Sequence, residues 1–80
     1  MKLREQYEKY MSPENVEQIR DRLIAIMDHY AWTMAKIAKQ LDMSPQTICK
    51  FIRDREDISF QSLLKVEDYV IEMEQRISQT

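Results

Sequence analysis

Basic side chains gather in the middle of the sequence, where they could bind phosphate groups. Residues 32–55 carry five basic side chains against two acidic ones, a net charge of +3, whereas the remaining residues carry seven basic and twelve acidic ones. A basic face on an acidic body can attract phosphate to one surface and repel it from the others. Ordinary solvated surface charge is the alternative interpretation, and the charge pattern alone does not separate the two. The five basic residues are Lys36, Lys39, Lys50, Arg53 and Arg55.

Residues that could act as nucleophiles, general bases or metal ligands are scarce. The 80-residue chain has one cysteine, Cys49, and one histidine, His29, which cannot together form a disulfide or a structural zinc site. A thiolate at Cys49 near Lys50 and Arg53 could sense oxidants, but no second cysteine is present to resolve it, so a small neutral spacer is favoured. We therefore expect no enzyme activity, no cofactor, no metal and no small-molecule substrate.

Two short helices with a sharp turn between them are expected to carry most of the basic side chains. Thr33 is a candidate N-cap for a helix over Met34–Leu41, and Asp42-Met43 interrupts that helix. Ser44-Pro45 starts a second helix, because serine can cap it and proline at the first position lacks only an N–H that needs no partner. The apolar residues that share one face are Ile37, Ala38 and Leu41 in the first helix, and Ile48, Phe51 and Ile52 in the second.

Helical patterning predicts three further helices around this pair. Lys2–Met11 could form a short one, with tyrosines and aliphatic residues on one side. Pro13–His29 forms a long amphipathic helix, because apolar residues recur there at steps of three and four. Its charged residues, Arg20 among them, are assigned to the other faces. The last helix is expected to run from a cap at Ser59 to about Ser78.

The stretch Thr33–Arg53 resembles the DNA-binding helix-turn-helix of the Cro/repressor-type (XRE) family of phage and bacterial regulators. Ala38 has the place of the small residue midway along the first helix, across which the second helix packs. Met43 is the apolar residue after the turn, and Ile48 and Phe51 are the two apolar anchors of the second helix.

The resemblance extends over about residues 30 to 70, with two departures. Ile58–Val66 resembles the start of the family's next helix, a serine cap followed by a leucine pair. Asp42 stands where the family usually has glycine, and aspartate tolerates the left-handed conformation at a penalty of about 1 kcal/mol relative to glycine. Met34 stands where the family usually has glutamine, which removes a phosphate contact.

The resemblance implies an all-α, compact five-helix lambda-repressor-like helix-turn-helix domain with an extended C-terminal helix. We expect one domain over residues 1–80, because a chain of this length has room for no more. It would consist of an N-terminal helical arm at 1–12, a core at 13–70 and a C-terminal helix extension at 71–80.

The resemblance also implies which side chains contact DNA. Gln46 is placed to form a bidentate pair with adenine, Lys50 suits guanine O6 and N7, and Thr47 could touch a thymine methyl group or a phosphate. The full set of expected base-reading residues is Ser44, Gln46, Thr47, Lys50 and Arg53. The expected phosphate contacts, which set affinity and register, are Thr33, Lys36, Lys39 and Arg55.

Val70, Met73 and Ile77 continue the apolar seam of the last helix beyond the residues expected to close the core. The seam is heptad-like but too short to form a coiled coil alone. It needs a cover from the N-terminal segment, with Tyr7 and Tyr10, or from the same helix of a second copy. We favour the second copy and predict a homodimer with these three residues at its interface, because helix-turn-helix proteins commonly bind two half-sites one DNA turn apart.

Taken together, these features predict a sequence-specific double-stranded DNA-binding transcriptional regulator. It would be a dimeric repressor of the phage or plasmid kind that occludes an operator. The alternative is a protein-binding module on a helix-turn-helix scaffold: an antitoxin, an antirepressor or a phage inhibitor of a host protein. No apolar run reaches the length of a membrane span and no signal peptide is visible, so a cytoplasmic location is expected.

Overall fold

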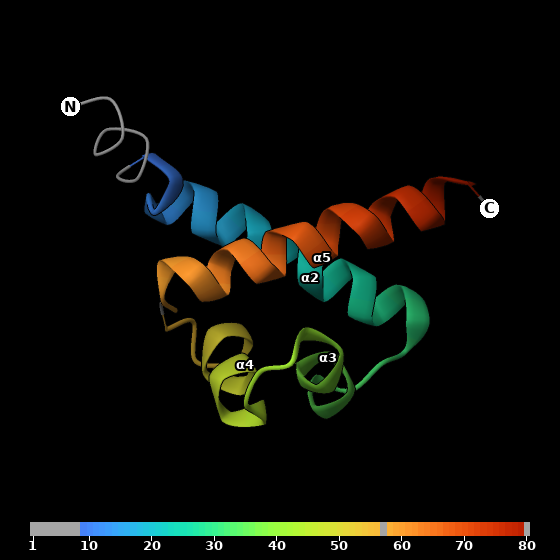
Figure 1. Cartoon of the computed structure of the whole chain (residues 1–80), viewed down its shortest axis with the longest axis horizontal. Helices are drawn as coiled ribbons and strands as arrows, with labels where there is room; N and C mark the ends of the chain where they lie inside the picture. The colour runs from blue at the N-terminus through green and yellow to red at the C-terminus, as the bar shows by residue number, and fades with distance from the viewer. Residues whose placement is uncertain (1–8, 57, 80) are drawn as a thin grey trace.

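The computed structural model describes residues 9–56 and 58–79, and within these ranges the chain forms four α-helices and no strand (Figure 1). The helices are α2 (Pro13–Tyr30), α3 (Met34–Leu41), α4 (Pro45–Ile52) and α5 (Phe60–Gln79). The all-α class is therefore confirmed. The predicted helix at Lys2–Met11 lies mostly outside the described residues.

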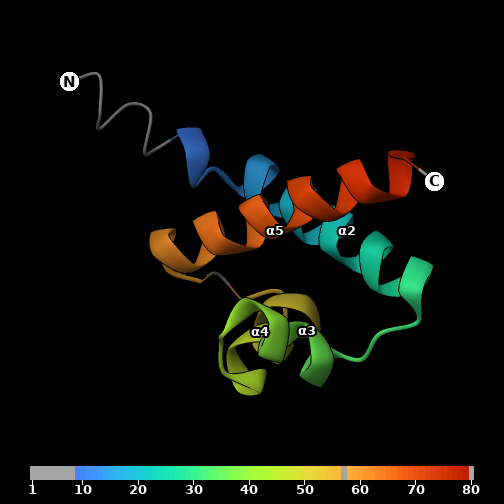
Figure 2. The same ribbon diagram turned by 45° about the vertical axis from the view of Figure 1, so that its right-hand side comes forward.

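The two long helices form one layer and the two short helices form the other. Helix α5 crosses α2, and α3 and α4 lie together on one side of that pair (Figures 1 and 2). Helix α2 contacts both α4 and α5, and α3 contacts both α4 and α5. Because every helix packs against at least two others, apolar side chains from all four meet in a single core.

Each helix begins at a side-chain cap that the sequence contains. The hydroxyl oxygens of Ser12, Thr33 and Ser44 accept hydrogen bonds from backbone N–H groups of the first turns of α2, α3 and α4, at 3.2 to 3.3 Å. The Ser59 hydroxyl accepts from the Ser62 N–H in the same way at 3.2 Å. These bonds satisfy donors that have no partner within the helix, and the predicted helix starts are confirmed.

Two helices end on a residue in the left-handed conformation, and neither residue is glycine. Ala31 ends α2 with φ 56° and Asp42 ends α3 with φ 56°. In each case the next N–H reaches back to a carbonyl five residues earlier: Trp32 N to Met27 O and Met43 N to Ala38 O, both at 2.9 Å. The chain therefore makes the sharp stops that glycine usually provides, at the expense of local backbone strain.

Replacing Ala31 with glycine is expected to stabilise the protein by about 0.5–1 kcal/mol, because the Cβ clash is removed while the terminal hydrogen bonds stay. Asp42→Gly should act in the same direction. The matched control is Ala25→Gly at an exposed position inside α2, which should destabilise by about 1 kcal/mol. Urea unfolding of the three variants measures these differences, and an equal loss at positions 25 and 31 would contradict the assigned helix end.

The residues predicted to form a dimer interface are largely buried within the single chain. Val70 is fully buried and Met73 is 5% exposed, while Ile77 is partly buried against the core. Helix α2 lies across α5 and, with the rest of the core, supplies the cover that the sequence left open. In this conformation Val70 and Met73 are therefore covered by the chain's own helices, and their contact with a second copy stays a prediction.

A bidentate ion pair also joins the two long helices. Arg22 of α2 donates from its Nε to Glu74 Oε2 of α5 at 2.9 Å and from a terminal nitrogen to the other carboxylate oxygen. The hydrogen bond from Arg22 holds the pKa of Glu74 below its usual value. Because folding lowers this pKa, the pair stabilises the fold above the usual glutamate pKa, and that contribution is lost as pH falls through the lowered value.

Glu74→Gln is therefore expected to reduce the free energy of unfolding at pH 7 by less than about 1 kcal/mol, since both side chains are partly solvated. The difference from the unmodified chain should shrink as pH falls below the usual glutamate pKa, and it should disappear once pH is below the lowered pKa, where the carboxylate is protonated in both states. Urea unfolding at pH 7 and at a series of acidic pH values measures it. Glu72→Gln is the control, because Glu72 pairs with Arg76 on its own helix, and a larger effect there would contradict the assignment.

Candidate nucleic-acid interface

Helix α4 is held in place by apolar side chains along its inner face. Ile48 and Phe51 of α4 and Ala38 of α3 are all 0% exposed. The small side chain of Ala38 belongs to the same buried cluster, which lets the two short helices approach closely. The predicted inner faces of α3 and α4 are thus confirmed.

The outer face of α4 is polar and open to solvent. Ser44, Gln46, Lys50 and Arg53 are exposed, and Thr47 is half-buried. The Ser44 hydroxyl is engaged as the cap of α4, with the Gln46 N–H as its donor. Over the described part of the chain, the side chains of Gln46, Lys50 and Arg53 have no hydrogen-bond or ion-pair partner.

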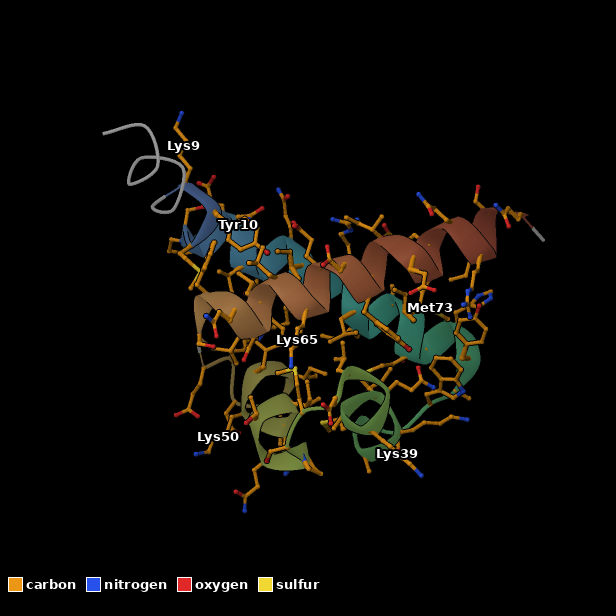
Figure 3. The ribbon with its side chains drawn as sticks, in the orientation of Figure 1. Lys9, Tyr10, Lys39, Lys50, Lys65 and Met73 are labelled. Carbon is orange, nitrogen blue, oxygen red and sulfur yellow. The ribbon has the colours of Figure 1, made fainter. Side chains whose placement is uncertain are left out.

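The expected phosphate contacts have different environments. Lys39 is exposed, and Figure 3 shows Lys39 and Lys50 on the side of the molecule that faces away from α5. The Lys36 amine lies 5.0 Å from the centre of the Trp32 ring. Thr33 is used as the cap of α3, and the guanidinium of Arg55 is paired with Glu17 of α2.

Trp32 contacts aromatic and basic side chains near the start of α3. Its ring stacks on Tyr30 with centroids 4.4 Å apart and an interplanar angle of 14°, and Lys36 lies over it. Trp32 is partly buried and packs against the core. Cys49, between the buried and exposed faces of α4, is a half-buried free thiol.

Arg20 lies on the buried side of α2, contrary to the expectation that it belongs to a face other than the apolar one. It is 3% exposed. Its Nε donates to the Phe51 carbonyl at 2.6 Å and its guanidinium lies 4.6 Å from the centre of the Phe51 ring. A terminal nitrogen donates to Glu17. Position 20 lies four residues after Val16 and three before Leu23, so the apolar spacing of α2 already contained the signal.

Arg20 helps to complete the C-terminal end of α4. The last carbonyls of a helix have no partner within it. Cys49 O accepts from Arg53 N at 2.8 Å, Lys50 O accepts from Glu56 N at 3.0 Å, and Phe51 O accepts from Arg20. The end of α4 is therefore tied to α2 by a buried charge, which stabilises the position of its outer face.

The arginine at the end of α4 differs from the other described arginines because it forms no ion pair with a described residue. Arg53, which follows α4, has no ion pair among the described residues. The arginines held in ion pairs are Arg20, Arg22, Arg55 and Arg76. On the α3–α4 layer, the cations that have no carboxylate partner within residues 9–56 and 58–79 are Lys36, Lys39, Lys50 and Arg53. Positive charge on this layer is thus free to meet an external anion.

An open depression of about 420 Å³ lies between the end of α3 and α5. Its charged residues are mostly acidic, unlike those of the α3–α4 layer. The Tyr69 hydroxyl donates to Gln40 Oε1 across it. It is lined by Gln40, Leu41, Asp42, Lys65, Asp68, Tyr69 and Glu72. Three carboxylates against one amine make it a poor site for phosphate.

The described residues offer no metal site and no membrane span. No three histidine, cysteine, aspartate or glutamate side chains among them lie close enough to share a metal ion. None of the four helices combines the length and the apolar character needed to cross a bilayer.

Comparison with known protein families finds no family that matches the chain, and neither the curated proteins nor the solved structures compared with it match. Function has to be inferred from the residues and geometry described above.

Ala38→Leu is expected to reduce the free energy of unfolding by about 1–3 kcal/mol, because a fully buried alanine leaves no room for three more carbons. The control is Ala35→Leu, an exposed position on the same helix, which should change stability by less than about 0.5 kcal/mol. Chemical denaturation compares the two. Equal effects would mean that α3 and α4 do not pack closely at Ala38.

Proposed function

We propose that the chain is a sequence-specific double-stranded DNA-binding regulator of the Cro/repressor type, with α3 and α4 as its helix-turn-helix. The observation that supports this most is the two-sided character of α4. Its inner residues Ile48 and Phe51 are fully buried. On its outer face, Gln46, Lys50 and Arg53 carry hydrogen-bonding groups that have no partner among the described residues. A helix fixed on one face and unsatisfied on the other is suited to enter the major groove.

Three residues of the outer face lie on one stripe. Gln46, Lys50 and Arg53 are separated by four and three residues, the spacing at which side chains of a helix share a face. Gln46 lies in the first turn of α4, the end that helix-turn-helix proteins direct to base edges. Glutamine can pair with adenine N6 and N7, and lysine can donate to guanine O6 and N7. Ser44 and Thr47 flank this stripe and complete the proposed base-reading set.

The neighbouring helix supplies contacts to the DNA backbone. Lys39 is exposed in the last turn of α3, and Lys36 and Thr33 lie at the start of α3. Contacts of this kind fix the register of the protein on the duplex without reading sequence. Their contribution is electrostatic, so binding should weaken as salt concentration rises.

Occlusion is the proposed mechanism of regulation. A small domain that covers an operator blocks access of RNA polymerase to that DNA without a separate activating surface. Two copies bound to half-sites one turn apart would cover more of the operator and add affinity. Val70 and Met73 are buried in the single chain, so a homodimer would have to use another surface.

A protein-binding module is the second candidate, favoured by one observation on α5. Leu64 and Ile71 are 37% and 41% exposed and lie seven residues apart, on one face of the helix. Acidic side chains occur beside them on the same helix, which suits a basic protein surface better than DNA. Stable capture of a protein partner, with no binding to any duplex, would favour this candidate over the first.

Selection of bound duplexes from a random pool should enrich a defined sequence, and an inverted repeat if two copies bind together. Against that sequence, Gln46→Ala and Lys50→Ala should each weaken binding by about 1–3 kcal/mol and relax discrimination at one base position. Fluorescence anisotropy with matched and mismatched duplexes measures both effects.

The control for lost positive charge is Arg76→Ala, which removes an exposed cation on α5 that pairs with Glu72. It should leave base discrimination unchanged. Unaltered affinity after the combined change of Gln46 and Lys50 would show that α4 is not the recognition helix.

A further inference from the structure

Glu17 links two arginines that serve different parts of the molecule. One carboxylate oxygen accepts from Arg20 and the other accepts from Arg55. Arg20 is buried and bonded to the end of α4, whereas the Arg55 side chain is 56% exposed. One acidic residue of α2 therefore balances a buried cation and also holds an exposed one.

The ion pair with Glu17 limits the ability of Arg55 to bind phosphate. Arg55 follows α4 and has the left-handed conformation, φ 55°, in a turn closed by the bond from Glu56 N to Lys50 O. Its guanidinium is directed to α2 and neutralised there, while Arg53, two residues earlier, has no such partner in the part of the chain that the structure describes. A phosphate that approached Arg55 would have to displace the carboxylate and would be repelled by it.

We propose that Glu17 withholds Arg55 from DNA, so that Arg55 acts as a positioning residue for the end of α4 and Glu17 limits the number of phosphate contacts. The inference rests on the proposed DNA-binding function, and it replaces the sequence-based expectation that Arg55 holds a phosphate. Removing the charge of Glu17 releases Arg55 and adds one phosphate contact. Buried Arg20 adds none, because it cannot reach an external anion.

Counterion release provides the measurement, because it counts phosphate contacts on any duplex. The probe is a fluorescent 20-base-pair duplex of arbitrary sequence, with dissociation constants taken by anisotropy between about 50 and 200 mM salt. Each additional contact steepens the slope of log affinity against log salt by about 0.9, which is about a 3.5-fold larger loss of affinity over that range. The proteins compared are the unmodified chain, Glu17→Gln, Arg55→Gln, the double variant and Glu14→Gln.

The expected result is a slope steeper by about 0.9 in Glu17→Gln and an unchanged slope in Arg55→Gln and the double variant. Glu14→Gln removes the same charge from an exposed position of α2, so it separates released Arg55 from a general change in net charge. A slope flattened by Arg55→Gln, with none of the steepening in Glu17→Gln, would overturn the proposal. Equal steepening in Glu14→Gln and Glu17→Gln would also overturn it.

Failure of the proposed function is distinguished by a measurement that needs no DNA. Nuclear magnetic resonance of the arginine Nε–Hε groups should show that Glu17→Gln shifts the Arg20 and Arg55 signals, whereas Glu14→Gln does not. Shifted signals with no duplex binding by any variant would refute the DNA-binding function and leave the pairing intact. Unshifted signals would refute the pairing itself.

Discussion

The arrangement of the short helices depends on one buried charge. Arg20 occupies a position on the apolar stripe of α2, and there it donates to Phe51 O, lies over the Phe51 ring and pairs with Glu17. A buried guanidinium is tolerated only when its donors are satisfied, so the three partners have to be placed together. Helices of eight residues are marginal in isolation, and α4 is therefore defined by this contact and by its apolar inner face more than by its own propensity.

The local features of the fold could be predicted because they depend on a few neighbouring residues. Ser44 followed by Pro45 specifies a helix start whatever the rest of the chain does, and the structure begins α4 there. Asp42 tolerates the left-handed conformation that a sharp helix end requires, and it adopts it. The apolar face that contains Ala38 and Ile48 follows from helical periodicity alone, and both residues are fully buried.

The features that could not be predicted depend on how the long helices cross. Periodicity shows that Val70 and Met73 need a cover but does not identify it, and α2 provides in the same chain what a second copy was expected to provide. Arg20 was misplaced for a related reason. A charged residue on an apolar stripe is explained only by its partners, and the Phe51 carbonyl lies 31 residues away in sequence. Glu17 and Arg55 are 38 residues apart, so local patterns cannot predict their ion pair either.

The two layers of the fold differ in whether their cations are paired with carboxylates. Within the described residues, ion pairs that involve α2 or α5 engage Arg20, Arg22, Arg55 and Arg76, so these cations stabilise the body. Lys39, Lys50 and Arg53 belong to the α3–α4 layer and have no carboxylate partner there. The net charge of the chain is −2, so the proposed affinity for DNA would not come from the total charge. It would come from the local excess of unpaired cations on the α3–α4 layer, and a carboxylate that pairs with one of these cations would lower that affinity without contacting the DNA.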